Sequence, residues 1–206
     1  MTANESVTQW CRLHDDGYFE KHPHYKEWRI VEYVADNCFA RYVNLCPDDV
    51  VLEIGCGYGR LMYGVADCVS HVVGIDVHPA PLAKARVILQ KKRNTAVMLS
   101  DGCSLPFPDD SFDVVYAQSV MQHIPRAMVK NYVVESCRVL RRGGRLCFQF
   151  PDARLLPRRE NVIDLKKCTE QSIAWTPKEL FEIVDGVDVD VYQAPPHSLY
   201  LFGVVK

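Results

Sequence analysis

Three glycines at alternate positions, directly after an apolar run, constrain the fold of this sequence more than any other feature. The apolar run VVLEI spans residues 50–54, and Gly55, Gly57 and Gly59 follow it. Glycine in such a segment costs stability because the unfolded chain loses more conformational freedom. We therefore expect a tight turn whose backbone a bulky partner approaches closely.

Short apolar runs alternate with longer helical patterns over residues 50–150. Runs that are apolar throughout, rather than at every second residue, are typical of parallel strands covered on both faces. The predicted strands are 50–54, 71–76, 95–101, 112–118 and 144–150, and the predicted helices are 60–69, 79–93 and 126–141, the last ended by Gly143-Gly144. This pattern predicts a doubly wound, Rossmann-like α/β fold with helices on both faces of a mostly parallel sheet.

We expect the segments on either side of this core to complete one domain over residues 1–206. Residues 1–46 are predicted to form a helical cap segment, with an amphipathic helix at 27–45, and residues 47–150 are predicted to form the core. Residues 151–206 supply a long polar connection, a helix and a terminal β-hairpin. That helix begins with a capping box, in which Thr176 precedes Pro177 and Glu179. With the hairpin the sheet reaches seven strands, of which one C-terminal strand is antiparallel.

Composition excludes several classes of protein. The chain has 206 residues, a formal net charge of −2 and 48% hydrophobic residues, so it lacks the charge of a nucleic-acid-binding protein and the composition of a disordered one. The start shows no signal peptide, and no apolar run is long enough to span a bilayer. Nine scattered cysteines without C-x-x-C spacing indicate reduced thiols. We expect a cytoplasmic protein that contacts neither nucleic acid nor membrane.

The glycine turn predicts what kind of ligand binds there. Ligands of doubly wound sheets bind at the carboxyl ends of the strands, beside the first turn between strand and helix. The dinucleotide motif G-x-G-x-x-G would require glycine at position 60, where Arg60 stands. Glu53, two residues before the first glycine, would repel a pyrophosphate. An acidic turn suits a ligand that carries an ammonium or sulfonium group.

Four segments together resemble class I S-adenosylmethionine-dependent methyltransferases. They are VLEIGCGYG, VVGIDVHP, SDGCSLPFPDDSFDVVYAQSVMQHI and LRRGGRLCFQF, and they occur in the family's order and spacing. The resemblance is close over residues 50–150 and extends to the whole chain in element order. It implies S-adenosylmethionine as cofactor and S-adenosylhomocysteine as product.

The resemblance also implies roles for individual residues. Glu53 and the turn would hold the methionine end of the cofactor, Asp76 would accept both ribose hydroxyls, and Asp101 would accept from the adenine amino group. The expected cofactor-binding residues are Glu53, Gly55, Cys56, Gly57, Gly59, Asp76, Val77, Asp101, Gly102, Cys103 and Gln118. His123 occupies a position that is often histidine in the family and is the candidate general base.

Simpler interpretations stay open for each of these residues. The glycines alone make a tight turn, Asp76 alone is a helix N-cap, and Asp101 alone is a turn residue. His123 alone orders the loop that follows it.

The acceptor is not identified by any motif. We expect a small molecule, which the N-terminal Tyr18, Tyr25 and Trp28, the connection's Arg154 and the hairpin's His197 would contact; a solvated loop and ordinary packing are the alternatives. Histidines without acidic or thiol partners at ligand spacing predict no metal site. A homodimer is possible. The alternative functions are a non-catalytic cofactor-binding partner subunit and a methyltransferase acting on protein or nucleic acid.

Overall fold

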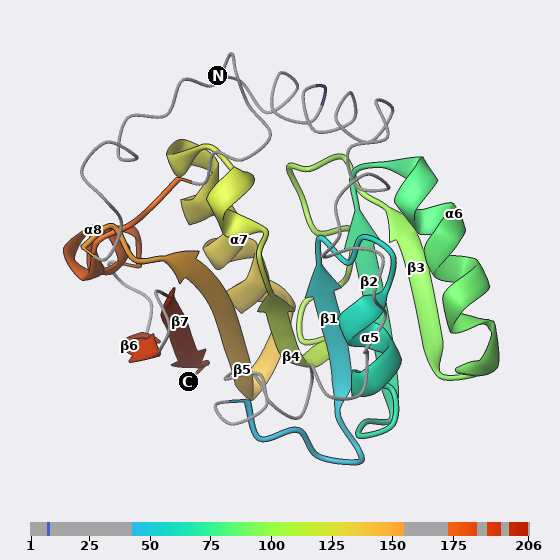
Figure 1. Cartoon of the computed structure of the whole chain (residues 1–206). Helices are drawn as coiled ribbons and strands as arrows, with labels where there is room; N and C mark the ends of the chain where they lie inside the picture. Colours follow the sequence, from blue (N-terminus) through green and yellow to red (C-terminus); the bar gives the residue numbers. More distant parts are fainter. Residues whose placement is uncertain (1–7, 9–42, 155–172, 185–188, 195–197, 206) are drawn as a thin grey trace.

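The computed structural model describes residue 8 and residues 43–154, 173–184, 189–194 and 198–205. Seven strands form one sheet in the order β3-β2-β1-β4-β5-β7-β6 (Figure 1). The strands are β1 (Val50–Ile54), β2 (His71–Asp76), β3 (Thr95–Leu99), β4 (Phe112–Ala117), β5 (Leu140–Pro151), β6 (Val189–Ala194) and β7 (Ser198–Val204). The helices between them are α5 (Arg60–Val65), α6 (Pro79–Ile88), α7 (Arg126–Val139) and α8 (Pro177–Ile183), with short 3-10 turns η2 (Leu89–Lys91) and η3 (Met121–His123).

The sheet is parallel from β3 to β5 and antiparallel where β7 pairs with β5 and with β6. Strand order reverses beside β1, since β2 and β4 are its two neighbours. In a doubly wound sheet this reversal marks the place where ligands bind. The predicted fold class, including the antiparallel strand of the C-terminal hairpin, is confirmed.

Two apolar layers, one on each face of the sheet, make the core. One layer joins Leu52 and Val115 to Val133 on α7 and Leu180 on α8. The other joins alternate residues of the same strands to α5 and α6, and its members include Val51, Val114, Leu61, Met62, Leu82 and Ala85. Because both faces are covered, the central strands are apolar at nearly every position, as the sequence predicted.

The predicted end of the helix before β5 is wrong. α7 ends at Val139, and Leu140 is already extended and pairs with Phe112 of β4. Gly143 and Gly144 therefore lie inside the irregular first part of β5, where the register shifts and Gly143 N donates to Val205 O at 2.6 Å. Pairing with β4 and with the chain's C-terminal segment outweighs the local helical pattern there.

Other boundaries differ less. α5 ends at Val65 rather than residue 69, and β3 ends at Leu99 rather than residue 101. The capping box at Thr176 is present, with both of its reciprocal hydrogen bonds. The helix predicted at 27–45 lies outside the described residues except for its last part, where Val43 is helical and buried.

The described cysteines, Cys46, Cys56, Cys68, Cys103, Cys137 and Cys147, are all free thiols. Within the described part of the chain, no helix combines the length and hydropathy needed to cross a membrane.

Candidate functional site

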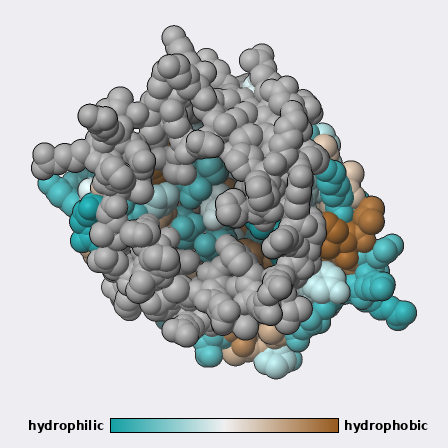
Figure 2. Space-filling view, in the orientation of Figure 1, coloured by the Kyte–Doolittle hydropathy of each residue, from teal (hydrophilic) through white to brown (hydrophobic). Residues whose placement is uncertain are grey.

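The glycine turn connects the carboxyl end of β1 to α5. The φ angles of Gly55, Gly57 and Gly59 are 70°, 52° and 76°, all in the left-handed region that favours glycine. The turn is fixed to the neighbouring strand because the N–H groups of Gly55 and Cys56 both donate to Ile75 O, at 2.8 and 3.0 Å. On the face shown in Figure 2, many of the described residues that are visible between the grey segments are hydrophilic.

Two of these glycines have different surroundings. A Cβ on Gly55 would lie 2.8 Å from Val120 Cγ1, so this glycine lets the loop after β4 pack against the turn. A Cβ on Gly57 would meet no heavy atom within 4 Å. Gly57 therefore faces open space, and the backbone there is accessible to a ligand.

Asp76 ends β2 directly beside the turn. Its Oδ2 accepts from Gly57 N at 2.9 Å, and its Oδ1 accepts from His78 N at 3.0 Å. Burial raises the pKa of this carboxyl, and the backbone N–H groups of Gly57, His78 and Val77 oppose that rise. Three backbone N–H groups thus act on a carboxylate that offers about four acceptor positions, so it retains acceptor capacity for a hydroxyl donor. The predicted N-cap role belongs to His78, whose Nδ1 accepts from Ala80 N.

Asp101 lies beyond β3 and closes a turn with its own side chain. Its Oδ1 accepts from Cys103 N at 2.8 Å and from Ser104 N at 2.9 Å, and its Oδ2 accepts from Ser104 Oγ at 3.0 Å. These bonds, led by that from Ser104 N, lower the pKa of the carboxyl. The simpler interpretation of Asp101 as a turn residue therefore accounts for these contacts, while Oδ2 keeps room for a further donor. Gly102 is buried beside it, and its N–H donates to Ser100 Oγ.

The loop after β4 carries Gln118 and leads to His123 in η3. Gln118 is partly buried, and the next residue, Ser119, has a φ of 59°. This conformation is held by Gln149 of β5, whose Oε1 accepts from Ser119 N at 2.8 Å. Together with the contact of Val120 on Gly55, this bond places the loop against the glycine turn.

His123 is partly buried at the end of this loop. Burial lowers the pKa of its imidazole to about 4, so the ring is neutral at pH 7. Its Nε2 lies 3.1 Å from Gln122 Nε2. Since an amide nitrogen only donates, Nε2 accepts in this arrangement and Nδ1 carries the proton.

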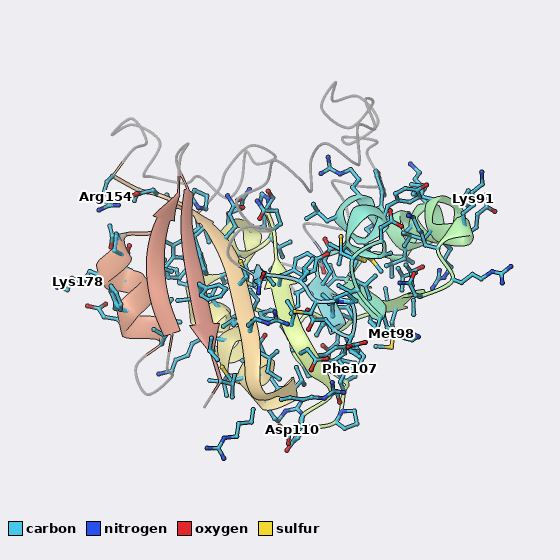
Figure 3. The ribbon with its side chains drawn as sticks, turned by 90° about the horizontal axis from the view of Figure 1, so that it is seen from below. Lys91, Met98, Phe107, Asp110, Arg154 and Lys178 are labelled. Atoms are coloured by element: carbon cyan, nitrogen blue, oxygen red, sulfur yellow. The ribbon has the colours of Figure 1, made fainter. Side chains whose placement is uncertain are left out.

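Arg154 lies just beyond β5, on the side of the sheet where α8 packs (Figure 3). Its side chain is 47% exposed, while that of its partner Asp152 is fully buried, and Arg154 Nη2 donates to Asp152 Oδ2 at 2.7 Å. The guanidinium holds the pKa of the Asp152 carboxyl below its usual range. Arg154 is thus partly neutralised by an internal partner.

The described chain resumes at Ile173 beside the His123 loop. Ile173 N donates to Gln122 O at 2.8 Å, and Arg126 Nη2 donates to Ala174 O at 2.7 Å. Trp175 N then donates to Pro151 O at 2.9 Å. Residues 173–175 therefore join the loop that carries His123 to the end of β5.

The remaining predicted site residues, Tyr18, Tyr25, Trp28 and His197, lie outside the described residues. Among the residues that the structure does describe, no group of three or more histidine, cysteine or acidic side chains is arranged to hold a metal ion.

Sequence analysis missed three side chains that shape the site. Tyr116 of β4 donates to Glu53 Oε2 at 2.6 Å, Gln149 of β5 holds Ser119, and Asp152 holds Arg154. Tyr116 and Gln149 are separated from their partners by 63 and 30 residues, so no local pattern joins them. Asp152, two residues from Arg154, was detectable as an acid at the end of a predicted strand.

Comparison with known proteins places the glycine turn, Asp76 and the loop after β4 within one conserved type of domain. The family model described as "Methyltransferase domain" matches residues 52–148. The demethylmenaquinone methyltransferase of Tropheryma whipplei is 34% identical over 106 residues, which cover 52% of this chain and 43% of that protein. The match therefore spans less than half of the relative's own length.

Solved structures share this fold. The PH0226 protein from Pyrococcus horikoshii superposes with a TM-score of 0.73 at 20% identity, covering 92% of this chain and 99% of that one. Magnesium protoporphyrin IX methyltransferase from Synechocystis, solved with bound S-adenosylhomocysteine, superposes with a TM-score of 0.71 at 16% identity. It covers 98% of this chain and 100% of that one.

Proposed function

We propose that residues 52–148, which the "Methyltransferase domain" model matches, form a class I S-adenosylmethionine-dependent methyltransferase domain. The chain would transfer a methyl group from that cofactor to an oxygen or nitrogen of a small-molecule acceptor. The observation that carries the proposal is the pairing of the glycine turn with Asp76. The open backbone of Gly57 and a carboxylate with remaining acceptor capacity meet through a 2.9 Å hydrogen bond at the point where strand order reverses.

The residues present fit this cofactor. Asp76 would accept from the two ribose hydroxyls, and Val77, which follows it, would lie against the adenine. Asp101 would accept from the adenine amino group through Oδ2, with Gly102 and Cys103 beside it. The methionine end would lie over the glycine turn, which comprises Gly55, Cys56, Gly57 and Gly59, near Glu53 and Gln118.

When bound, S-adenosylmethionine supplies an activated methyl group that a nucleophile displaces in line, with the thioether as leaving group. The chain's own contribution is to bind and align the reactants, which can lower such a barrier by ~7–11 kcal/mol.

His123 would accept the proton of a hydroxyl acceptor, since its imidazole is neutral at pH 7. For His123 Nε2 to act as the base, its hydrogen bond with Gln122 Nε2 must first break. His123→Asn should then lower kcat with a hydroxyl acceptor and leave the affinity for S-adenosylhomocysteine unchanged; equal kcat values would remove His123 from the mechanism.

A small-molecule acceptor is supported by the relatives' names, which include a demethylmenaquinone and a magnesium protoporphyrin IX methyltransferase. Arg154 is the described residue we propose for contact with an anionic group of the acceptor, because nearly half of its side chain is exposed. The contact residues proposed from sequence alone are Tyr18, Tyr25, Trp28 and His197.

The proposal is tested by calorimetric titration of S-adenosylhomocysteine into the wild-type chain and Asp76→Asn. An amide in place of the carboxylate would set its NH2 group against a backbone N–H and accept only one hydroxyl, so we expect the affinity to fall about tenfold or more. Asp67→Asn is the matched control, since the Asp67 side chain is 61% exposed and pairs with Lys92. Equal affinity of wild type and Asp76→Asn would contradict the proposed site.

Activity is tested with isotope-labelled S-adenosylmethionine and a panel of phenols, hydroquinones, carboxylic acids and amines. Transfer of label to any of them supports the proposal. If the chain binds the cofactor but transfers label only when a partner protein is added, a non-catalytic partner subunit is favoured. Transfer to protein or nucleic acid alone would overturn the proposal of a small-molecule acceptor.

A further inference from the structure

A row of facing residues crosses the sheet directly below the glycine turn. Glu53 of β1 is aligned with Gly74 of β2 on one side and with Tyr116 of β4 on the other. Tyr116 lies in the apolar layer that α5 covers, as does Val51, two positions before Glu53 in β1. The row therefore points toward α5 and lies on the inner side of the turn.

The absence of a side chain at Gly74 brings the turn onto this row. A Cβ on Gly74 would lie 2.7 Å from Cys56 Cβ, so Cys56 packs over the glycine and the turn closes above Glu53. Glu53 is 3% exposed, and Tyr116 is fully buried. The carboxyl group is thus enclosed by the turn, α5 and Tyr116.

Within this enclosure, Tyr116 is the donor. Burial, and to a smaller extent the charge of nearby Glu53, raises the pKa of the Tyr116 phenol well above its usual range. The phenol therefore keeps its proton and donates a hydrogen bond to Glu53 Oε2 at 2.6 Å. Hydrogen bonds to charged groups are about twice as strong as those between neutral groups, so this bond favours the ionised form of Glu53.

The other charged groups around Glu53 leave its ionised form poorly compensated. Burial raises the pKa of Glu53 to about 8; the bond from Tyr116, the charge of Arg60 and the backbone of Met62 oppose the rise, and Asp76 adds to it. Cys56, which faces the same space, is an uncharged thiol whose pKa burial raises. A positive charge over the turn would supply the compensation that these groups do not.

We propose that Tyr116 is a positioning residue that holds Glu53 for the cationic methionine end of the cofactor, and that cofactor binding expels a proton from this pair. The inference rests on the proposed function. On binding, the O–H bond of the Glu53 carboxyl breaks, the proton passes to the buffer, and the carboxylate remains bonded to Tyr116 Oη. The ammonium group of the ligand balances the new negative charge.

Proton release is measured by calorimetry of S-adenosylhomocysteine binding at pH 7, in phosphate and in Tris, which differ in ionisation enthalpy. The wild-type chain should release close to one proton more than Glu53→Gln, whose amide does not titrate. Equal proton counts for the two would overturn the coupling.

The role of Tyr116 is tested by Tyr116→Phe, which keeps the ring and removes the donor. Loss of a hydrogen bond to a charged group should weaken binding about ten- to a hundredfold. Tyr63→Phe is the matched control, since Tyr63 lies on α5 and its ring, which contacts Lys92, is retained. Unchanged affinity of Tyr116→Phe would overturn the positioning role.

Failure of the two proposals is distinguishable. If the wild-type chain binds neither S-adenosylmethionine nor S-adenosylhomocysteine, the proposed function fails. If it binds them with the proton count of Glu53→Gln, only the further inference fails. If Tyr116→Phe does not fold, by circular dichroism, the comparison of wild type with Glu53→Gln still decides whether the coupling exists.

Discussion

Gly55 and Gly57 lie two residues apart in one turn, yet an added methyl group would meet different surroundings at each. At Gly55 it meets the Val120 side chain, and at Gly57 it meets open space. Both residues have positive φ, so both substitutions carry backbone strain of about 1–2 kcal/mol. The difference between them separates the packing role of the turn from its proposed binding role.

Gly55→Ala should lower the free energy of unfolding by about 3 kcal/mol, because strain and overpacking against Val120 add. Gly57→Ala should lower it by only about 1 kcal/mol and weaken S-adenosylhomocysteine binding about tenfold or more, because its methyl group enters the ligand's space. Urea unfolding and calorimetry measure the two quantities. If Gly57→Ala binds as the wild type does, the ligand does not lie over Gly57.

How far the contacts of these residues follow from the sequence depends on how local each signal is. Gly57 and Asp76 stand at the ends of adjacent predicted strands, so their meeting followed from the expected fold. Glu53 was identified from its place before the glycines, but its partner Tyr116 belongs to a strand 63 residues away. Tyr116 looks like one more apolar residue of a buried strand, and only the register of β1 against β4 makes it a partner.

The bounds of the helices and strands also follow from the sequence where the signal is local and not where it depends on a contact distant in sequence. β1 and β2 have the predicted bounds because their buried apolar runs end sharply at the turn and at Asp76. The junction of α7 with β5 was misjudged because pairing of Leu140 with Phe112, a contact distant in sequence, ends the helix before the glycines do. α8 was placed correctly because its start is encoded in neighbouring residues.

The start of α8 is therefore a suitable place to measure a local signal. Thr176 Oγ1 accepts from Glu179 N at 3.3 Å, and Glu179 Oε2 accepts from Thr176 N at 2.7 Å. Thr176→Ala should lower the free energy of unfolding by about 1 kcal/mol, the usual value for loss of an N-cap. Lys178→Ala, at a side chain 86% exposed, is the control and should change it by less than about 0.5 kcal/mol. Equal stabilities in urea would show that packing alone holds α8.

Across the whole molecule, the polar groups discussed above gather at one rim of the sheet. Asp76 ends β2, and the glycine turn, Asp101, Gln118 and Asp152 follow the carboxyl ends of β1, β3, β4 and β5. The opposite rim carries a different kind of polar contact. There Arg145 of β5 reaches the segment before β1, donating to Val43 O at 3.0 Å and to Asp49 Oδ1 at 2.5 Å.

The contact of Arg145 with Asp49 joins residues 96 positions apart, and the Asp49 side chain is only 7% exposed. Arg145→Met would leave this carboxylate buried without its ion-pair partner, so the free energy of unfolding should fall by about 3 kcal/mol. The double variant Asp49→Asn with Arg145→Met should recover part of the loss, because the uncompensated charge is gone. Arg142→Met, at an exposed neighbour, is the control. This rim lies away from the glycine turn. The folded Arg145→Met chain should therefore bind S-adenosylhomocysteine with the affinity of the wild type. A fall in affinity would show that the two rims are coupled.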